Sequence, residues 1–392
     1  MPILISLISS AILFFFSSKV LAYPDFISYG YRACMLCHYT GSGGGALNDY
    51  GKAVFASELT ARTFTNKTPD EMGESSGFLG SKELPWWFRP GIKYRGLWFR
   101  RNVWDSNKSD RSLSMQFDVD LVFKFDPREK YILVTNLGYI PTPSRFKTSS
   151  DPDPSNAIFR QFYLRAMVGK GVYVYGGLFD KFYGIKHADH TAFNRGDISM
   201  GMSDQTHGAA IQYQTSKFDF AAHAFLGNLN QESEIRQKGF SFTTEYFLSE
   251  FATVGASVLS SESNYKSEKR FALLSRLGFD KGKSFFIETG YKQDETVKQT
   301  GPNVINEKGA YTYMQSLVEY AQGYNFLTTY QYKKPNLSSS QSNEVNRLGI
   351  GLLLFPMMRT ELRGELVNTR TTAPESTSPD EWSLVSQVHF SW

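Results

Sequence analysis

The chain has 392 residues and balances 42 lysines and arginines against 38 aspartates and glutamates, for a formal net charge of +4. A charge this small does not indicate a nucleic-acid-binding protein, and we expect no nucleic-acid partner. The mean hydropathy of -0.34 is typical of a soluble protein or of a membrane barrel whose strands hide their apolar residues by alternation. The sequence shows no nucleotide-binding loop, catalytic triad or zinc pattern.

Residues 1–22 predict a signal peptide. An apolar run over residues 3–16 leads to Val20-Leu21-Ala22, where small or compact residues suit a signal peptidase. No lysine or arginine precedes Lys19, so an uncleaved anchor is the alternative. In either case we expect the rest of the chain to be exported.

The five residues Cys34-Met35-Leu36-Cys37-His38 match the C-x-x-C-H pattern of c-type haem attachment and contain both cysteines of the chain. Two thiols separated by two residues can reach the two haem vinyl groups while the adjacent imidazole binds the iron. We therefore expect one covalent haem c on Cys34 and Cys37, with His38 as the proximal ligand. The alternative is a disulfide in a small exported segment.

Glycines 41 and 43–45 follow the motif and allow backbone to pass close to a flat macrocycle. Beyond them Leu47, Tyr50, Val54 and Leu59 fall near helical spacing, which predicts a short amphipathic helix covering a haem face. A flexible linker and an ordinary surface helix are the alternative. We assign residues 23–65 to the haem-binding segment and residues 66–90 to a linker. Because a segment this short has a small core, we expect the rest of the chain to supply a second wall around the haem.

Residues 91–392 alternate as the strands of a barrel do. Between Ser112 and Phe125 apolar residues such as Leu113 and Phe117 share one face, and polar residues such as Asp118 share the other. The same alternation recurs at residues 240–248, 270–279 and 359–366. One apolar face and one face with charges of both signs suit a barrel that spans a bilayer around a wet lumen.

The connections alternate in length. We predict short turns at residues 126–129, 169–170, 215–217, 249–250, 280–283, 321–323 and 355–357. Longer polar loops fall at about 141–157, 181–206, 228–237, 261–269, 295–309, 334–344 and 369–380. Short periplasmic turns and long outer loops are the outer-membrane arrangement. We therefore predict an all-β fold, a transmembrane antiparallel barrel of about 16 strands with a short α-helical haem segment before it. A soluble all-β protein is the alternative.

With these features the chain resembles the fused outer-membrane monohaem cytochrome c–porins, the porin-cytochromes of extracellular electron transfer and outer-membrane iron oxidation. The resemblance rests on Cys34, Cys37 and His38, on residues 47–53 and on the barrel pattern. It implies an electron-transfer protein in the outer membrane of a Gram-negative-type bacterium. The Gly43-Gly44-Gly45 insertion departs from the iron oxidases, so the iron substrate is not carried over.

The sixth iron ligand is left open by the sequence. Alternation along the last strand predicts that His389 faces the lumen near the periplasmic end, and His223 is expected to face inward nearer the outside. The other histidines cluster at the loop 181–206, which can fold inward and narrow the pore. Methionine is also a possible ligand type. We rank His190, His207 and His389 ahead of His187 and His223.

Two functions follow from these expectations. The first is an electron carrier, or alternatively an outer-membrane oxidoreductase, with its haem segment on the periplasmic side or in the lumen. An apolar band roughly 25 Å tall is longer than one haem. We therefore expect a periplasmic cytochrome or other carrier on one side, an external redox partner on the other, and lipid around the barrel. The second is a diffusion porin in which the haem segment is a plug or a sensor.

Overall fold

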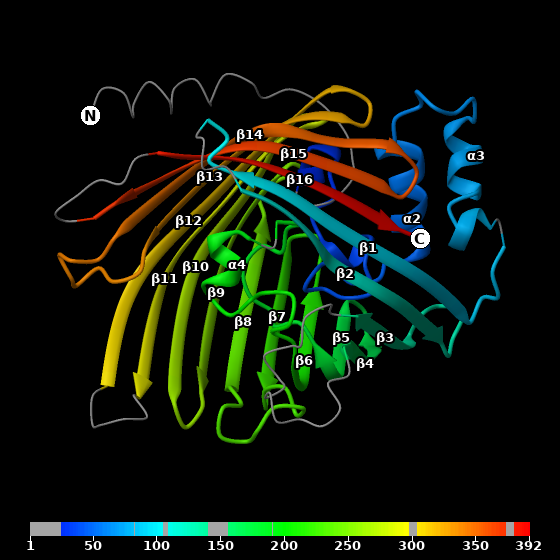
Figure 1. Cartoon of the computed structure of the whole chain (residues 1–392). Helices are drawn as coiled ribbons and strands as arrows, with labels where there is room; N and C mark the ends of the chain where they lie inside the picture. The colour runs from blue at the N-terminus through cyan, green and yellow to red at the C-terminus, as the bar shows by residue number, and fades with distance from the viewer. Residues whose placement is uncertain are drawn as a thin grey trace.

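The computed structural model of the chain describes residues 25–81, 83–104, 109–139, 156–189, 191–297, 304–373 and 380–392. Sixteen antiparallel strands close into a barrel, in which β1 pairs with β2 on one side and with β16 on the other. Figure 1 shows α2, α3 and the C-terminus at the same end of the barrel. The predicted fold class and the number of strands are confirmed.

The strands account for most of the described chain. In order they are β1 Phe88–Arg101, β2 Ser109–Lys124, β3 Tyr131–Tyr139, β4 Ala157–Gly169, β5 Val172–Phe179, β6 Thr206–Gln214, β7 Phe218–Phe225 and β8 Lys238–Phe247. The second half comprises β9 Ala252–Glu262, β10 Lys266–Asp280, β11 Lys283–Val297, β12 Val304–Ala321, β13 Tyr324–Lys334, β14 Glu344–Met357, β15 Thr360–Thr372 and β16 Glu381–Ser391.

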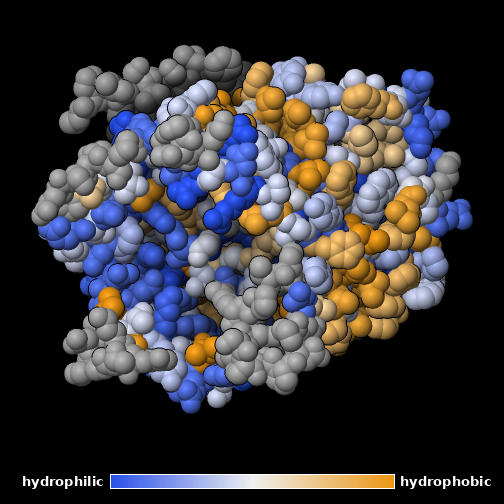
Figure 2. Space-filling view, viewed as in Figure 1, coloured by the Kyte–Doolittle hydropathy of each residue, from blue (hydrophilic) through white to orange (hydrophobic). Residues whose placement is uncertain are grey.

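Side chains alternate across the barrel wall as the sequence predicts. On β2 the side chains of Asp118, Asp120 and Lys124 are buried, whereas Phe117 on the opposite face is exposed. Figure 2 shows apolar side chains gathered over the half of the surface nearer the C-terminus and hydrophilic ones toward the other end. The outer face therefore carries apolar residues while the inner face is polar and charged.

Three connections differ from the prediction. The loop expected at about 295–309 is shorter, because β11 continues to Val297 and β12 begins at Val304; residues 298–303 lie outside the described residues. The range 261–269 was expected to be a long loop, but β9 continues to Glu262 and β10 begins at Lys266. Ser263 N donates to Lys266 O at 2.8 Å and closes this turn. The polar residues here remain in the sheet because their side chains bond to one another inside the barrel. The short turn expected at 355–357 comes later, since β14 extends through Met357 and β15 starts at Thr360.

The N-terminal segment, residues 25–65, packs against the inside of the barrel. Its helical turns are η1 Asp25–Tyr29, η2 Cys34–Leu36, α2 Asp49–Val54 and the π-helical η3 Phe55–Leu59. The predicted short helix is thus present, and Asn48 caps it by accepting a hydrogen bond from Gly51 N at 2.7 Å. A buried cluster joins Phe26, Tyr29, Val54 and Leu59 to the barrel residues Leu317, Leu327, Leu353 and Phe355. The barrel therefore supplies the second wall of this segment.

The range expected to be a linker contains a helix, α3 Pro69–Glu74. Thr68 and Glu71 form a capping box, in which Glu71 N donates to Thr68 Oγ1 at 3.3 Å and Thr68 N to Glu71 Oε2 at 2.7 Å. Met72 is fully buried, and α3 packs against α2 and η3. A short 3-10 turn, η4 Phe78–Gly80, precedes β1. None of the described helices is long and apolar enough to cross a bilayer.

The connection from β5 to β6, residues 180–205, folds into the barrel, and we call it the lumen loop. It contains α4 Phe193–Gly196. Ile185 N donates to Glu288 Oε2 on β11 at 2.7 Å, and Phe193 N donates to Gln331 Oε1 on β13 at 3.1 Å. These contacts reach strands far from β5 and β6 around the barrel, so the expectation that this loop folds inward is confirmed for its described residues.

Candidate functional site

A cavity lies between the N-terminal segment and the lumen loop, with about 210 Å³ of space for water-sized molecules. Three parts of the chain line it. The N-terminal segment contributes Cys34, Cys37 and His38, the lumen loop contributes Lys186, His187 and Met202, and the barrel wall contributes Lys93, Arg95 and His389. The C-x-x-C-H motif and two further histidines therefore line the same cavity.

The C-x-x-C-H residues form a tight turn on this cavity. Cys37 N and His38 N both donate to Cys34 O, at 3.2 and 3.0 Å, and neither cysteine is in a disulfide. Burial raises the pKa of both thiols to about 12. Burial, with the nearby charges of Lys93 and Lys186, lowers the pKa of His38 to about 3. The imidazole is therefore neutral, which is the form that binds a metal.

Glycines let neighbouring chain segments approach the turn closely. Gly43 and Gly44 have φ angles of 79° and 69°, a conformation that residues with a side chain rarely adopt. A Cβ on Gly43 would lie 3.2 Å from Cys34 Sγ, and one on Gly44 would lie 2.9 Å from Lys186 Cε. A Cβ on Gly51 would lie 2.4 Å from Cys37 O. Both the lumen loop and α2 thus pack directly against the motif.

The two histidines that share the cavity differ in how their rings are held. His187 has Nε2 2.9 Å from Asn194 Oδ1, while its buried Nδ1 has no hydrogen-bond partner. His389 has Nδ1 3.2 Å from Arg95 Nη2 and 3.5 Å from Glu361 Oε2, while its buried Nε2 has no partner. The predicted inward orientation of His389 is confirmed. His187 was ranked below the three favoured histidines and Met202 was not singled out, because no sequence pattern shows which residues of an inward loop face the cavity.

The remaining candidates lie elsewhere. His207, at the start of β6, accepts a hydrogen bond on Nδ1 from Leu229 N at 3.0 Å and does not line the cavity. His190 lies outside the described residues. His223 is buried inside the barrel as expected, with its ring stacked on that of Phe179 at a centroid distance of 4.5 Å. Of the two favoured histidines that the structure describes, His207 and His389, His389 lines the motif's cavity.

Basic side chains line the polar part of the cavity. Lys93 pairs with Asp120 at 2.7 Å and donates to Gly45 O at 2.5 Å, which ties β1 to the N-terminal segment. Lys186 pairs with Asp180 within the lumen loop. Arg195 donates through Nε to Met200 O at 3.1 Å, and burial lowers its pKa. The cavity wall thus offers both apolar surface and positive charge.

Polar contacts fix the N-terminal segment to the barrel. Asp49 pairs with Arg89 at 2.6 Å and with Lys124 at 2.9 Å. Arg165 Nη1 donates to Tyr39 O at 3.2 Å, and its Nη2 donates at 3.0 Å to Glu129 O in the short turn after β2. The segment is therefore bound at the short-turn end of the barrel. Further contacts join Arg276 to Arg32 O, Gln322 to Thr60 O and Ala61 N to Phe355 O.

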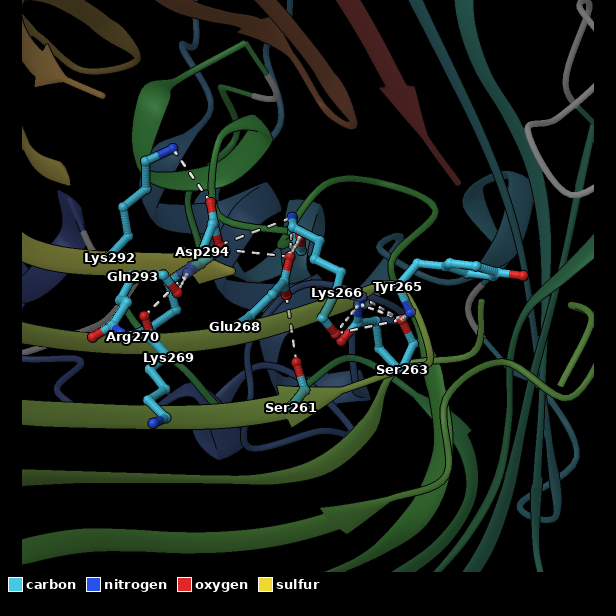
Figure 3. A network of polar contacts seen from close by, with 12 residues as sticks. Ser261, Ser263, Tyr265, Lys266, Glu268, Lys269, Arg270, Lys292, Gln293 and Asp294 are labelled. Atoms are coloured by element: carbon cyan, nitrogen blue, oxygen red, sulfur yellow. Dashed lines mark hydrogen bonds and ion pairs between the residues drawn. The ribbon is translucent and has the colours of Figure 1, made fainter. Parts of the chain in front are cut away.

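The other end of the lumen holds a charged network on three adjacent strands (Figure 3). Glu268 on β10 pairs with Lys266 and accepts from Ser261 Oγ on β9 at 3.4 Å. Arg270 pairs with Asp294 on β11 at 2.5 Å. Ser199 of the lumen loop donates to Glu268 Oε1 at 2.9 Å. Charges of both signs therefore lie between the lumen loop and the long-loop end of the barrel.

Within the part of the chain that the structure describes, no group of three or more histidine, cysteine, aspartate or glutamate side chains is placed to hold a metal ion.

The barrel is similar to solved outer-membrane proteins. It matches OmpT of Vibrio cholerae with a TM-score of 0.57 at 11% identity, covering 78% of this chain and 97% of that one. It matches the channel DcaP of Acinetobacter baumannii with a TM-score of 0.55 at 12% identity, covering 78% of this chain and 97% of that one. It matches OprB of Pseudomonas putida with a TM-score of 0.57 at 8% identity, covering 78% of this chain and 94% of that one. No protein-family model and no curated protein matches the chain. At these identities the similarity establishes a porin-like fold.

Proposed function

We propose that this chain is a porin-like outer-membrane protein that carries one covalent haem c in its lumen and exchanges electrons between periplasmic carriers and an external donor or acceptor. The observation that carries the proposal is the position of the C-x-x-C-H turn. Its two cysteine side chains and its imidazole line one cavity inside the barrel, together with two more histidines. The comparisons support the porin part of the proposal alone.

The residues around the motif fit such a group. On the N-terminal segment the cavity is lined by Phe26, Leu47, Val54, Phe55 and Leu59, which suit an apolar macrocycle. On the barrel and the lumen loop, Lys93, Arg95, Lys186 and Arg195 suit its two carboxylate side chains. Cys34 and Cys37 would hold the group covalently and His38 would bind its iron. A bound haem c supplies a centre that is oxidised and reduced by one electron.

The position of the motif suits a periplasmic partner. Arg165 donates to Glu129 O in a short turn, and its Nη1 lies 3.9 Å from Met35 Sδ. The motif therefore lies near the end that would face the periplasm. Leu36, between the two cysteines, is 41% exposed, so a soluble cytochrome or other carrier can reach this side of the site. The exposed apolar residues of the barrel wall would contact outer-membrane lipid in a Gram-negative-type bacterium.

A second candidate function is a diffusion porin in which the N-terminal segment is a plug or a sensor. Known structures favour it over electron transfer, because the fold they share is that of channels and porins. The charged network around Glu268 and Arg270 gives the long-loop end a hydrophilic lining of the kind that passes polar solutes. The two functions predict different behaviour in a sealed vesicle.

The test is a vesicle that encloses a reduced soluble c-type cytochrome, with an oxidant outside that is small enough to enter the long-loop mouth of the barrel. The native protein should oxidise the enclosed cytochrome faster than the Cys34→Ala/Cys37→Ala variant does. Ion conductance is measured on the same preparations. Equal oxidation rates for native and variant protein would contradict the proposal, and high conductance in both would support the porin instead.

A further inference from the structure

Three buried ring nitrogens on the cavity wall have no hydrogen-bond partner: Nδ1 of His38, Nδ1 of His187 and Nε2 of His389. His38 belongs to the motif, whereas His187 and His389 come from the lumen loop and the barrel wall. A buried polar atom without a partner costs free energy that a folded protein normally avoids. A ligand in the cavity would supply the missing partner. The two histidines are therefore the first places to look for a second bond to an iron held by His38.

The geometry of the two rings separates them. The unpartnered Nδ1 of His187 is the ring nitrogen bonded to Cγ, the nearer of the two to its own main chain, and its Nε2 is held by Asn194. Its ring also stacks on Tyr313 with centroids 4.2 Å apart. In His389 the unpartnered atom is Nε2, which lies at the far side of the ring from the main chain. His389 therefore presents the nitrogen that reaches farther from the backbone.

The register of β1 and β16 places His389 close to the motif. Arg95 is the partner of His389 across the two strands, and Lys93 is the partner of Ser391. Lys93 and Arg95 share a face of β1 and their Cα atoms are about 6.6 Å apart in an extended strand. Lys93 donates to Gly45 O of the N-terminal segment, and it lies near enough to His38 to influence its charge. One short stretch of β1 thus contacts both sides of the cavity.

Two side chains reach Nδ1 of His389 and favour opposite tautomers. Arg95 Nη2, at 3.2 Å, can only donate, whereas the carboxylate of Glu361, at 3.5 Å, can only accept. Iron on Nε2 requires the proton on Nδ1, so binding would make Glu361 the partner. A carboxylate behind a ligating imidazole fixes the ring and increases its basicity.

We infer that His389 is the second axial ligand of the haem iron, bound through Nε2, and that Glu361 is a positioning residue that holds its ring. This inference rests on the proposed function, since it requires a haem on Cys34 and Cys37. It differs from that function in naming which wall of the barrel the iron contacts, β16 rather than the lumen loop.

The test compares variants of the full-length protein that carry covalent haem. Native protein should show the spectrum of six-coordinate low-spin haem, and His389→Ala should become high-spin and return to low-spin when imidazole is added. His187→Gln and Met202→Leu change two other residues of the same cavity and should stay low-spin. If His389→Ala stays low-spin, or if His187→Gln or Met202→Leu becomes high-spin instead, the assignment is wrong while the proposed function stands.

Two further measurements cover loss of folding and the role of Glu361. His389→Met keeps a side chain that can bind iron and should raise the midpoint potential, because a thioether favours the ferrous state. Glu361→Gln should stay low-spin and also raise the potential, since a less basic imidazole stabilises ferric iron less. Unchanged potentials in both variants would overturn the inference. Absence of covalent haem from the native protein would overturn both the inference and the proposed function.

Discussion

At the scale of single residues, the motif is enclosed because glycines replace side chains around it. Gly43 and Gly44 adopt positive φ angles and leave room for Cys34 and for Lys186 of the lumen loop. A larger residue would have to strain its own backbone and also displace one of these neighbours. The space around the thiols therefore depends on residues that have no functional groups of their own.

Gly43→Ala should destabilise the N-terminal segment by about 1–2 kcal/mol, because alanine in the left-handed conformation brings Cβ close to a carbonyl oxygen. The new Cβ would also lie 3.2 Å from Cys34 Sγ, so the yield of covalent haem should fall. Gly73→Ala is the matched control, since its Cβ would meet nothing within 4 Å. Haem staining and denaturant unfolding measure both effects, and equal behaviour of the two variants would contradict the prediction.

For residues in strands, the sequence predicted which side chains face the lumen. Alternation placed His389 and Asp118 on the inner face because successive strand residues point to opposite sides of the sheet. It did not place His187 or Met202, because a loop has no such period. Their positions depend on contacts such as Phe193 N to Gln331 Oε1, which join residues 138 positions apart in the chain. Local sequence carries no signal for such a pair.

At the scale of elements, α2 is attached to the barrel through one carboxylate. Asp49, the first residue of α2, pairs with Arg89 of β1 and Lys124 of β2. Lys124 is almost fully buried, so loss of Asp49 would leave its charge with Glu129 as the ion-pair partner. The sequence predicted the helix here but not its docking. It also missed α3, whose six residues are too few for a periodic pattern.

Asp49→Asn should weaken the docking of α2 by about 1 kcal/mol, as expected for partly exposed ion pairs. Asp70→Asn removes an exposed carboxylate from α3, which follows the N-terminal segment, and is the control. Limited proteolysis of residues 25–81 in detergent should be faster in Asp49→Asn than in the control. If the two variants were cleaved at the same rate, Asp49 would not hold the segment.

Acid should weaken the same contact. Burial alone would raise the pKa of Asp49, but hydrogen bonds and charges from Arg89 and Lys124 hold it below its usual value of 3.8. A depressed pKa in the folded state means that the stabilisation is complete above that usual value and is lost as the pH falls through the folded pKa. Proteolysis of the native segment by an acid-active protease should therefore accelerate below about pH 4, and in Asp49→Asn this acceleration should be smaller.

At the scale of the whole molecule, two segments of the chain meet inside the barrel lumen. The N-terminal segment is bound at the short-turn end through Asp49 and Arg165, and the lumen loop crosses the interior through Ile185 and Phe193. The cavity with the motif lies between them. The strand number and the inward loop were predictable from alternation and loop length. The stacking of the two segments was not, because it depends on contacts between distant parts of the chain.

Removal of residues 25–81, which include the N-terminal segment, should open the pore, because the sixteen strands and the lumen loop remain while one of the two segments inside the barrel is gone. Single-channel conductance in planar bilayers should rise well above that of the full-length protein. Folding of the shortened barrel is checked by its heat-modifiable migration on gels. Equal conductance of the two folded proteins would show that the lumen loop alone closes the lumen.

The central claim is that the C-x-x-C-H turn in the lumen carries a haem, and intact-protein mass spectrometry tests it most directly. Protein purified from the outer membrane of a host with a c-type haem maturation system should have the mass of the chain plus one haem. The added mass should be absent from Cys34→Ala/Cys37→Ala. A native protein without the added mass, but with both thiols free to react with an alkylating reagent after unfolding, would contradict the account.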